Sequence, residues 1–222
     1  MERAYARRAS KSWKARLYRS LEPPLPLVQN PSEPVDFPLG RWNLYLGGAG
    51  CSVPGYVNLD LVAQPGVDVV ADAEHLPFPP GTFQRVECDA VLEHVRRPER
   101  VMEEITRVVA PAGYVHLVVP FCHPFHEYPR DYRRFTLDGL KLLTGNSMNI
   151  VAEGWRTGPT ATLLVFVLEY VKLWIPSRAW RGMVHFVLGW LLFPFRYLDL
   201  LLLKSARAGQ IGNHCFLWLR KL

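Results

Sequence analysis

The sequence predicts an α/β domain built on a doubly wound, mostly parallel β-sheet, and three features predict it. Short apolar runs alternate with loops and one amphipathic helix between residues 41 and 158. A glycine-rich turn at 47–50 follows the first run, and acidic residues close several later ones. Apolar runs of this kind are typical of parallel strands that are covered on both faces of the sheet.

We expect five strands in this region, at residues 43–46, 56–61, 67–71, 83–91 and 114–119. Residues 98–109 place apolar side chains at helical spacing, with glutamates on the other side, and are expected to form a helix. In parallel sheets, ligands bind beyond the carboxyl ends of the strands. The glycine turn and the strand-end acids Asp60, Asp72 and Asp89 therefore form one candidate site.

Each part of this candidate site suits one part of a nucleoside-like ligand. The turn allows close approach of the backbone, and its N–H groups can face a ligand; its residues are Gly47, Gly48, Ala49 and Gly50. Asp60, with Leu61 beside it, can accept hydrogen bonds from both hydroxyls of a ribose. Asp72 can accept from an adenine amino group while the backbone at Ala73 donates to the ring.

The stretch 44–120 resembles the class I S-adenosylmethionine-dependent methyltransferases, in the branch that modifies small molecules and sugars. Four segments carry the resemblance: Leu46-Gly47-Gly48-Ala49-Gly50, Asp72-Ala73-Glu74-His75-Leu76-Pro77-Phe78, Val91-Leu92-Glu93-His94-Val95 and Arg107-Val108-Val109-Ala110-Pro111-Ala112-Gly113. The resemblance implies the Rossmann-like methyltransferase fold with seven strands, S-adenosylmethionine as cofactor and methyl transfer as the activity. The chain departs from the family pattern at Tyr45, where an acid is common, and at Ala49, where a second glycine is common.

The loop at 121–136, directly after the fifth expected strand, carries the candidate catalytic groups. His126 and Asp131 suit general-base catalysis on a hydroxyl, in which the carboxylate orients the imidazole. His94, beyond the fourth expected strand, is a third catalytic candidate, although a packing role is equally open. His-x-x-His at 123–126 offers no obvious third ligand, so no metal is expected.

The same loop supplies the residues expected to bind the acceptor, namely His123, Tyr128 and Arg134. A structural interpretation of the loop remains open beside the functional one. In it, Asp131 pairs with Arg134, caps backbone groups and holds a rigid lid.

The composition changes to predominantly apolar at residues 159–208, which we expect to form a helical insertion before a final strand within 209–222. Residues 162–175 are too short to span a bilayer, and 183–203 are long enough but contain charged residues and a proline. The tryptophans and arginines around them favour a hairpin that lies in the membrane interface. A pair of spanning helices, or an insertion that covers the sheet or forms a dimer interface, remain alternatives.

The N-terminal residues 1–40 are expected to form a basic amphipathic helix, 1–21, and a proline-rich linker. Residues 1–20 hold seven Lys or Arg residues against one acid, and a transit peptide is the alternative interpretation. The four cysteines, at 51, 88, 122 and 215, form no close pair. This spacing favours a reducing cytoplasm over a disulfide framework or a zinc knuckle.

Together these features predict a cytoplasmic, peripheral (monotopic) membrane methyltransferase that acts on a hydroxyl of a membrane-held acceptor, such as a lipid-linked glycan. A quinone or other small isoprenoid-type acceptor suits the apolar tail equally well. A third hypothesis is a catalytically inactive binding subunit, which Tyr45 and Ala49 favour. A nucleic-acid acceptor would explain the net charge of +6 but not the tail, so no nucleic acid is expected. The sequence does not predict the oligomeric state.

Overall fold

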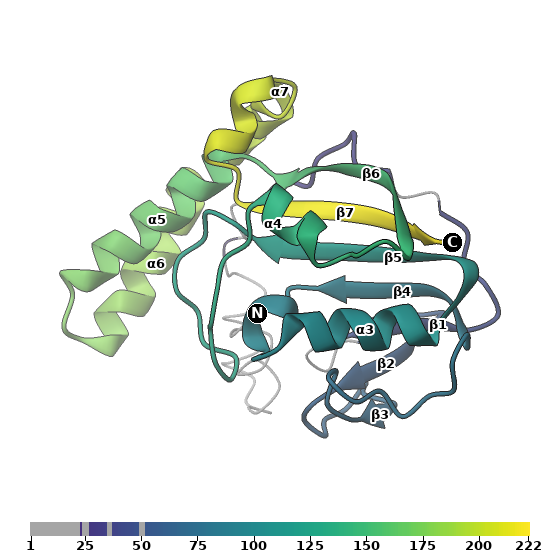
Figure 1. Cartoon of the computed structure of the whole chain (residues 1–222). Coiled ribbons are helices and arrows are strands. Elements are labelled where there is room, and N and C mark those ends of the chain that lie inside the picture. Colours follow the sequence, from purple (N-terminus) through teal and green to yellow (C-terminus); the bar gives the residue numbers. More distant parts are fainter. Residues whose placement is uncertain (1–22, 24–26, 35–36, 49–51) are drawn as a thin grey trace.

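The structure, a computed structural model, describes residues 23, 27–34, 37–48 and 52–222. Seven strands form one sheet in the order β3-β2-β1-β4-β5-β7-β6 (Figure 1). Strand β7 is antiparallel to β5 and β6, and the other neighbouring strands are parallel. The predicted mostly parallel, seven-stranded sheet of an α/β fold is therefore confirmed.

The elements agree with the expected ranges to within a few residues at most ends. The strands are β1 (Asn43–Leu46), β2 (Val57–Asp60), β3 (Val69–Val70), β4 (Phe83–Asp89), β5 (Val109–Pro120), β6 (Met148–Thr157) and β7 (His214–Lys221). The helices are η1 (Leu92–His94), α3 (Pro98–Val108), α4 (Leu137–Leu142), α5 (Pro159–Leu173), α6 (Arg178–Leu192), η2 (Phe193–Leu198), α7 (Asp199–Leu202) and η3 (Ala206–Gln210). The basic helix predicted at 1–21 lies outside the described residues.

Helices α3 and α4 pack on one face of the sheet and enclose the apolar core (Figure 1). Helix α3 begins with Pro98 at its first turn, where the missing N–H costs nothing. Its apolar stripe of Val101, Ile105 and Val108 is fully buried against the strands. The apolar residues that predicted this helix from their spacing are thus the residues that face the core.

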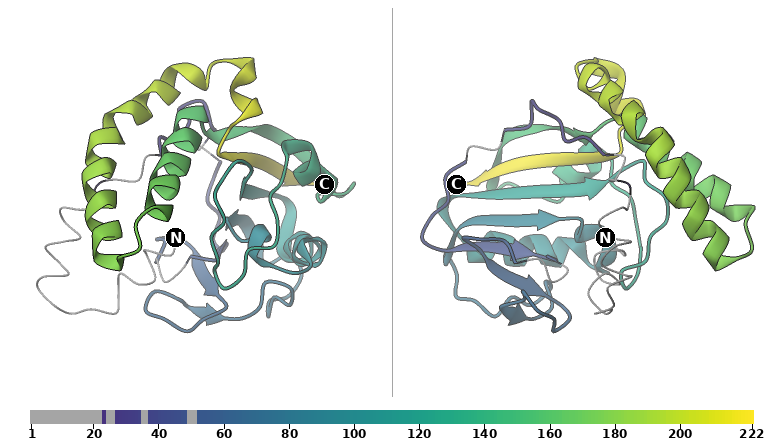
Figure 2. Two further views of the ribbon diagram at one scale, coloured as in Figure 1. Left: turned by 90° about the vertical axis from the view of Figure 1, so that its left-hand side faces the viewer. Right: turned by 180° about the vertical axis from the view of Figure 1, so that it is seen from behind.

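The opposite face of the sheet carries buried charged side chains beside a small apolar cluster, and within the described residues an extended segment, 27–34 and 37–39, lies on it instead of a helix (Figure 2). Phe37 of this segment packs against Trp218, with ring centroids 4.3 Å apart. Glu33 reaches the sheet and lies 2.9 Å from Nε2 of His116. The described parts of the connections between β1, β2 and β3, residues 47–48, 52–56 and 61–68, contain turns and bends and no helix.

Helices α5 and α6 form an antiparallel apolar hairpin between β6 and β7, which confirms the expected insertion before the last strand. The hairpin projects beyond the end of the sheet to which β4 and β5 point (Figures 1 and 2). Within the described residues, the segment Arg178–Leu202 is long and apolar enough to cross a membrane, and 11% of its most apolar window is buried.

Asp199, an acid inside this apolar segment, has a structural role. Its side chain is fully buried, and its two oxygens accept hydrogen bonds from the backbone N–H groups of Thr160 (2.8 Å) and Ala161 (2.9 Å). These groups open helix α5 and have no partner within their own helix, so the carboxylate caps them. Gly158 permits this approach, because a Cβ built there would lie 2.6 Å from Cγ of Asp199.

Candidate active site

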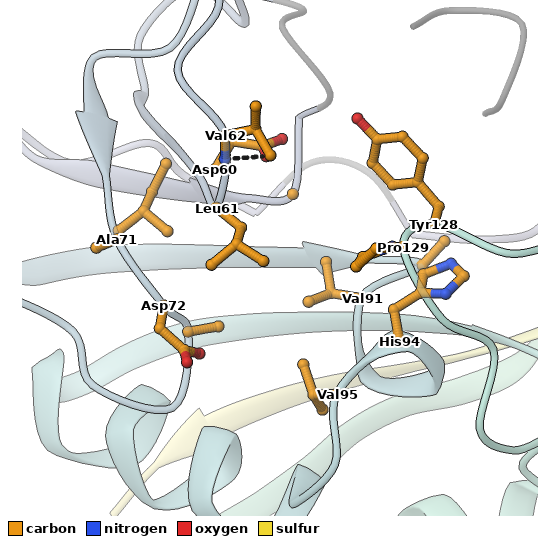
Figure 3. Close-up of a pocket in the computed structure, with 14 residues that line it drawn as sticks. Asp60, Leu61, Val62, Ala71, Asp72, Val91, His94, Val95, Tyr128 and Pro129 are labelled. Carbon is orange, nitrogen blue, oxygen red and sulfur yellow. Dashed lines mark hydrogen bonds between the residues drawn. The ribbon is translucent and has the colours of Figure 1, made fainter.

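A pocket of about 240 Å³ lies beyond the carboxyl ends of β1, β2 and β4, at the edge where the strand order reverses (Figure 3). The predicted residues Gly47, Asp60, Leu61, Asp72 and Ala73 all line it. This convergence was predicted from the sequence, because the carboxyl ends of parallel strands share one edge of the sheet. The convergence is what a single ligand site requires.

Gly47 provides the close backbone approach at the end of β1. Its φ is +73°, a conformation that favours glycine, and a Cβ built there would lie 2.3 Å from Cγ2 of Val91. An alanine at this position would therefore be strained and would also collide with the pocket wall. Of the remaining predicted turn residues, Gly48 is the second residue after β1 and does not line the pocket, and Ala49 and Gly50 lie outside the described residues.

The two carboxylates lie at different parts of the pocket (Figure 3). Asp60 ends β2, is 5% exposed, and accepts a hydrogen bond from the backbone N–H of Val62 (3.1 Å). Asp72 follows β3, and its Oδ1 accepts from the backbone N–H of Glu74 (2.9 Å). Both turns are fixed by these bonds, so each carboxylate keeps one orientation relative to the pocket.

The walls between these acids are mostly apolar, which suits a flat ring. Leu61, Val91 and Val95 contribute branched side chains to the lining (Figure 3). His94 and Tyr128, two predicted site residues, also line the pocket, and Figure 3 shows their side chains on the same side of it. A largely apolar cavity with a few polar groups is the usual form of a cofactor site.

Asp89, predicted to bind the cofactor, does not line this pocket. Its side chain lines a second, polar cavity on the opposite sheet face, 3.6 Å from Nη2 of Arg156. Successive side chains of a strand point to opposite faces, and Glu87 of the same strand lines the polar cavity as well. Asp89 is near the pocket because it ends β4, but the alternation of side chains along the strand directs its carboxylate to the other face of the sheet.

The predicted histidine loop folds back over η1, because the backbone N–H of Tyr132 donates to the carbonyl of Glu93 (2.9 Å). The rings of His94 and His126 consequently lie with their centroids 4.9 Å apart. His123 lies on the other side of His126, also at 4.9 Å, and its Nδ1 is 3.0 Å from Oδ1 of Asn213. The structure thus brings the three predicted histidines together.

The general-base hypothesis requires a hydrogen bond between the carboxylate of Asp131 and the imidazole of His126, and the structure does not contain it. Its Oδ2 accepts from the backbone N–H of His126 (2.7 Å), and Nδ1 of His126 lies nearer the carbonyl of Pro124 (3.2 Å) than the carboxylate (3.6 Å). Burial raises the pKa of Asp131, but hydrogen bonds from Arg134 and this N–H outweigh it and hold the pKa at about 2. A permanent carboxylate in this position stabilises the loop.

Arg134, predicted to bind substrate, uses its whole guanidinium on the loop. It donates to the carbonyls of His123 (3.1 Å), Arg133 (2.8 Å) and Pro124 (2.8 Å), and to both oxygens of Asp131. All five N–H donors are thereby engaged. The geometry matches the rigid-lid interpretation for Arg134 and Asp131.

We expect Arg134→Lys to loosen this loop and to lower the free energy of unfolding by roughly 1–3 kcal/mol, because an ammonium cannot replace a planar five-donor fork. Hydrogen exchange of residues 121–135 and chemical denaturation measure the two effects. Arg133→Lys is the matched control, since the exposed guanidinium of Arg133 donates one bond, to the carbonyl of Arg96. Equal exchange rates in the two variants would contradict the structural role of Arg134.

The histidines of the cluster are held neutral. Burial lowers the pKa of His94 and of His126, and it lowers the pKa of His123 to about 4. Burial also raises the pKa of Glu93, the neighbour of His94, to about 8. Neutral imidazoles can accept a proton at pH 7, which a general base must do.

Sequence reasoning missed two residues of this region. Glu93 enters the sequence analysis only as part of a family motif, although an acid beside His94 is a visible signal. Its side chain is buried, and its Oε1 lies 3.6 Å from Nε2 of His94 and 3.9 Å from Nε2 of His126. Asn213 ties the loop to the start of β7, because its amide donates to the carbonyl of Cys122 (2.9 Å) and its oxygen faces His123. No sequence pattern near Asn213 indicated this contact.

Comparison with known proteins assigns the class of this domain. A family model described as a methyltransferase domain matches residues 57–117. The "Demethylmenaquinone methyltransferase" of Renibacterium salmoninarum is 27% identical over 152 residues, which cover 68% of this chain and 59% of that protein. The "Ubiquinone/menaquinone biosynthesis C-methyltransferase UbiE" of Cupriavidus pinatubonensis is 30% identical over 110 residues, which cover 47% of this chain and 45% of that protein. The chain thus spans about half the length of these curated relatives.

Solved structures share the fold at low identity. The [4+2]-cyclase SpnF superposes with a TM-score of 0.54 at 17% identity, covering 97% of this chain and 84% of that chain. A putative methyltransferase from Bacillus halodurans C-125 superposes with a TM-score of 0.52 at 16% identity, and the match covers 84% of this chain and 94% of that chain. The strand order, the family match and the relatives agree. These findings support a class I S-adenosylmethionine-dependent methyltransferase family for the domain, and the pocket fits the cofactor of that family through its glycine approach, its two carboxylates and its apolar walls.

Proposed function

We propose that this chain transfers the methyl group of S-adenosylmethionine to an acceptor that is held at a membrane surface. One observation carries the proposal. The pocket lined by Gly47, Asp60 and Asp72, the histidine loop and the apolar hairpin all lie at the same end of the sheet (Figure 1). An acceptor anchored in a membrane beneath the hairpin would therefore reach the pocket without leaving the lipid.

The chain's residues have defined tasks in this reaction. When bound, S-adenosylmethionine supplies a methyl group that its sulfonium already activates. Asp60 and Asp72 hold the ribose and the adenine, and the loop orients the acceptor for in-line attack. Nε2 of His94 or of His126 would take the proton of the acceptor's hydroxyl as its oxygen receives the methyl group, and S-adenosylhomocysteine would leave.

Two kinds of membrane-held acceptor are compatible with this arrangement. The curated relatives are named for demethylmenaquinone and for ubiquinone and menaquinone biosynthesis, which favours an isoprenoid quinone-type acceptor. The neutral histidine cluster supports deprotonation of a hydroxyl, either phenolic or on the sugar of a lipid-linked glycan. Both acceptors combine a polar reacting group with a long apolar anchor.

The hairpin supports a membrane location through its exposed apolar side chains. Leu173 and Trp174, at the turn between α5 and α6, are 81% and 74% exposed, and Trp180 is 59% exposed. Arg178 and Arg181 lie beside them at the start of α6. Aromatic and basic residues around an apolar face are typical of segments that lie in the headgroup region. We therefore propose a peripheral, interfacial hairpin on a cytoplasmic membrane surface.

Replacing Leu173, Trp174 and Trp180 together by serine is expected to abolish co-flotation with liposomes that contain anionic lipid, because these residues supply the buried apolar area. Flotation of the full chain in a density gradient measures this effect. Leu142→Ser is the control, since Leu142 is 86% exposed but lies on α4. Undiminished flotation of the triple variant, or its conversion from a dimer to a monomer without loss of flotation, would contradict the membrane role of the hairpin.

Titration calorimetry with S-adenosylhomocysteine, followed by incubation with labelled S-adenosylmethionine and a membrane extract, tests the proposed activity. We expect binding and a labelled product in the lipid phase. A methyl group on a quinone ring or on a lipid-linked sugar identifies the acceptor class. Binding without any transferred label would establish the third hypothesis, an inactive binding subunit.

A further inference from the structure

A cluster of three potential metal ligands lies beside the pocket. Oε1 of Glu93 is 3.6 Å from Nε2 of His94 and 3.9 Å from Nε2 of His126, and all three atoms lie within 4.8 Å of one another. The sequence analysis expected no metal because His-x-x-His lacked a third ligand. The fold instead brings two ligands from η1, Glu93 and His94, to His126, whereas His123 is outside the cluster.

The buried carboxyl group of Glu93 is the least explained feature of the region. Its side chain is fully buried, and neither of its oxygens has a hydrogen-bond partner. Nε2 of His94 is buried and lacks a hydrogen-bond partner as well. Buried polar atoms without partners cost free energy and are rare, so three such atoms on two neighbouring side chains indicate a missing partner.

Both imidazoles are oriented as metal ligands are. Nδ1 of His94 lies 2.5 Å from the carbonyl oxygen of Arg130, and Nδ1 of His126 lies 3.2 Å from that of Pro124. A carbonyl accepts only, so the proton belongs on each Nδ1 and the lone pair on each Nε2 faces Glu93. Metal-binding histidines donate their second N–H to a carbonyl or carboxylate in this way. The guanidinium near Nδ1 of His126, at 3.4 Å, already donates to Asp131 and to Pro124.

We propose that Glu93, His94 and His126 bind a divalent transition-metal cation with the ligand preference of Zn²⁺ or Fe²⁺. Two imidazoles and one carboxylate suit these ions, whereas Ca²⁺ and Mg²⁺ prefer all-oxygen sites. Ligand bonds of about 2.1 Å in a tetrahedron separate the donor atoms by about 3.4 Å. The two separations from Oε1 of Glu93, 3.6 and 3.9 Å, exceed this value by a few tenths of an ångström, and the two Nε2 atoms lie within 4.8 Å of each other.

The cation would have a chemical consequence if the proposed function holds. His94 belongs both to the cluster and to the lining of the cofactor pocket, so the cation would adjoin that pocket. Three protein ligands leave a coordination position open, and a hydroxyl oxygen of the acceptor bound there would lose its proton more easily. Because the cation would occupy Nε2 of both histidines, that proton would pass to water in the metal-bound protein, and the histidines would accept it only in the metal-free protein. This consequence rests on the proposed methyl transfer, whereas the metal site itself does not.

Metal titration of the untagged full-length chain in detergent, after treatment with a chelator, tests the site. We expect one equivalent of Co²⁺ to bind with visible ligand-field absorption, and Zn²⁺ to displace it. Glu93→Gln and His126→Asn should each weaken binding at least tenfold. His75→Gln is the matched control, since His75 is exposed and outside the cluster, and its affinity should equal that of the wild type.

Equal Co²⁺ affinity in the wild type and in both ligand variants, or the absence of ligand-field absorption, would overturn the metal site. Circular dichroism during thermal unfolding identifies which of the two variants folds, and either one suffices for the comparison. S-adenosylhomocysteine titration is independent of the metal readout. If the wild-type chain does not bind S-adenosylhomocysteine, the proposed function is wrong, but the result of the metal titration is unaffected.

Discussion

Replacement of His116 by alanine is expected to lower the free energy of unfolding by about 3 kcal/mol, because it leaves two buried glutamates short of their shared partner. His116 stands on β5 in the polar face of the sheet, 2.6 Å from Glu87 and 2.9 Å from Glu33. Its ring also stacks on Trp218, with centroids 4.1 Å apart and an interplanar angle of 9°. The variant loses both charge-assisted hydrogen bonds and the stacking contact.

The cost of this substitution should depend on pH. Burial lowers the pKa of His116, but hydrogen bonds to Glu33 and Glu87 outweigh it and raise the pKa above 6.5. Its contribution to stability is therefore complete below pH 6.5 and is lost as pH rises through the folded-state pKa. Burial raises the pKa of Glu87, but its bond to His116 and the charges of His116 and Arg85 lower it below 4.5. The contribution of Glu87 is complete above pH 4.5 and is lost as pH falls through its folded-state pKa.

The difference in stability between wild type and His116→Ala should consequently be largest between about pH 4.5 and 6.5 and should shrink at alkaline pH. Urea denaturation across this range measures it. His75→Ala, at an exposed histidine, is the control and should lie within about 0.5 kcal/mol of the wild type. A pH-independent difference would mean that the imidazole acts through packing alone.

Asp60→Ala is expected to weaken S-adenosylhomocysteine binding by about 100-fold, since it removes a charged acceptor for two ribose hydroxyls. Asp60→Asn should weaken binding less, because its amide oxygen still accepts one hydrogen bond and retains the contact with the N–H of Val62. Calorimetric titration gives both affinities, and thermal unfolding checks that the turn is intact. Asp138→Ala is the control, since the side chain of Asp138 is 94% exposed on α4.

We predict that Asp60→Ala binds S-adenosylhomocysteine more weakly than Asp60→Asn, and that Asp60→Asn binds it more weakly than the wild type. This order separates recognition of a nucleoside from a purely structural role of the turn. Unchanged affinity in Asp60→Ala would remove the ribose assignment and, with it, the main support for the cofactor pocket. The same fold occurs in a [4+2]-cyclase. The assignment of activity must therefore come from site residues such as Asp60 and not from the fold.

Much of the architecture could be predicted from local pattern. Strand β1 and its glycine turn, the two pocket acids Asp60 and Asp72, and the insertion before β7 each have a signature that depends on neighbours in the chain. The single residue Asp89 shows the limit of this reasoning. Its place at a strand end was readable, but the face of the sheet that it occupies depends on the register of β4 between β1 and β5.

The sequence by itself determined the sheet, the nucleoside-type pocket at its edge and the apolar segment after β6, because apolar periodicity, glycine turns and strand-end acids are short-range signals. Only the tertiary structure decided that Asp131 and Arg134 lock the loop, that Glu93 meets two histidines, and that one sheet face holds buried charged side chains. These contacts join segments far apart in the chain. They depend on how the loop at 121–135 packs on η1, which no local pattern encodes.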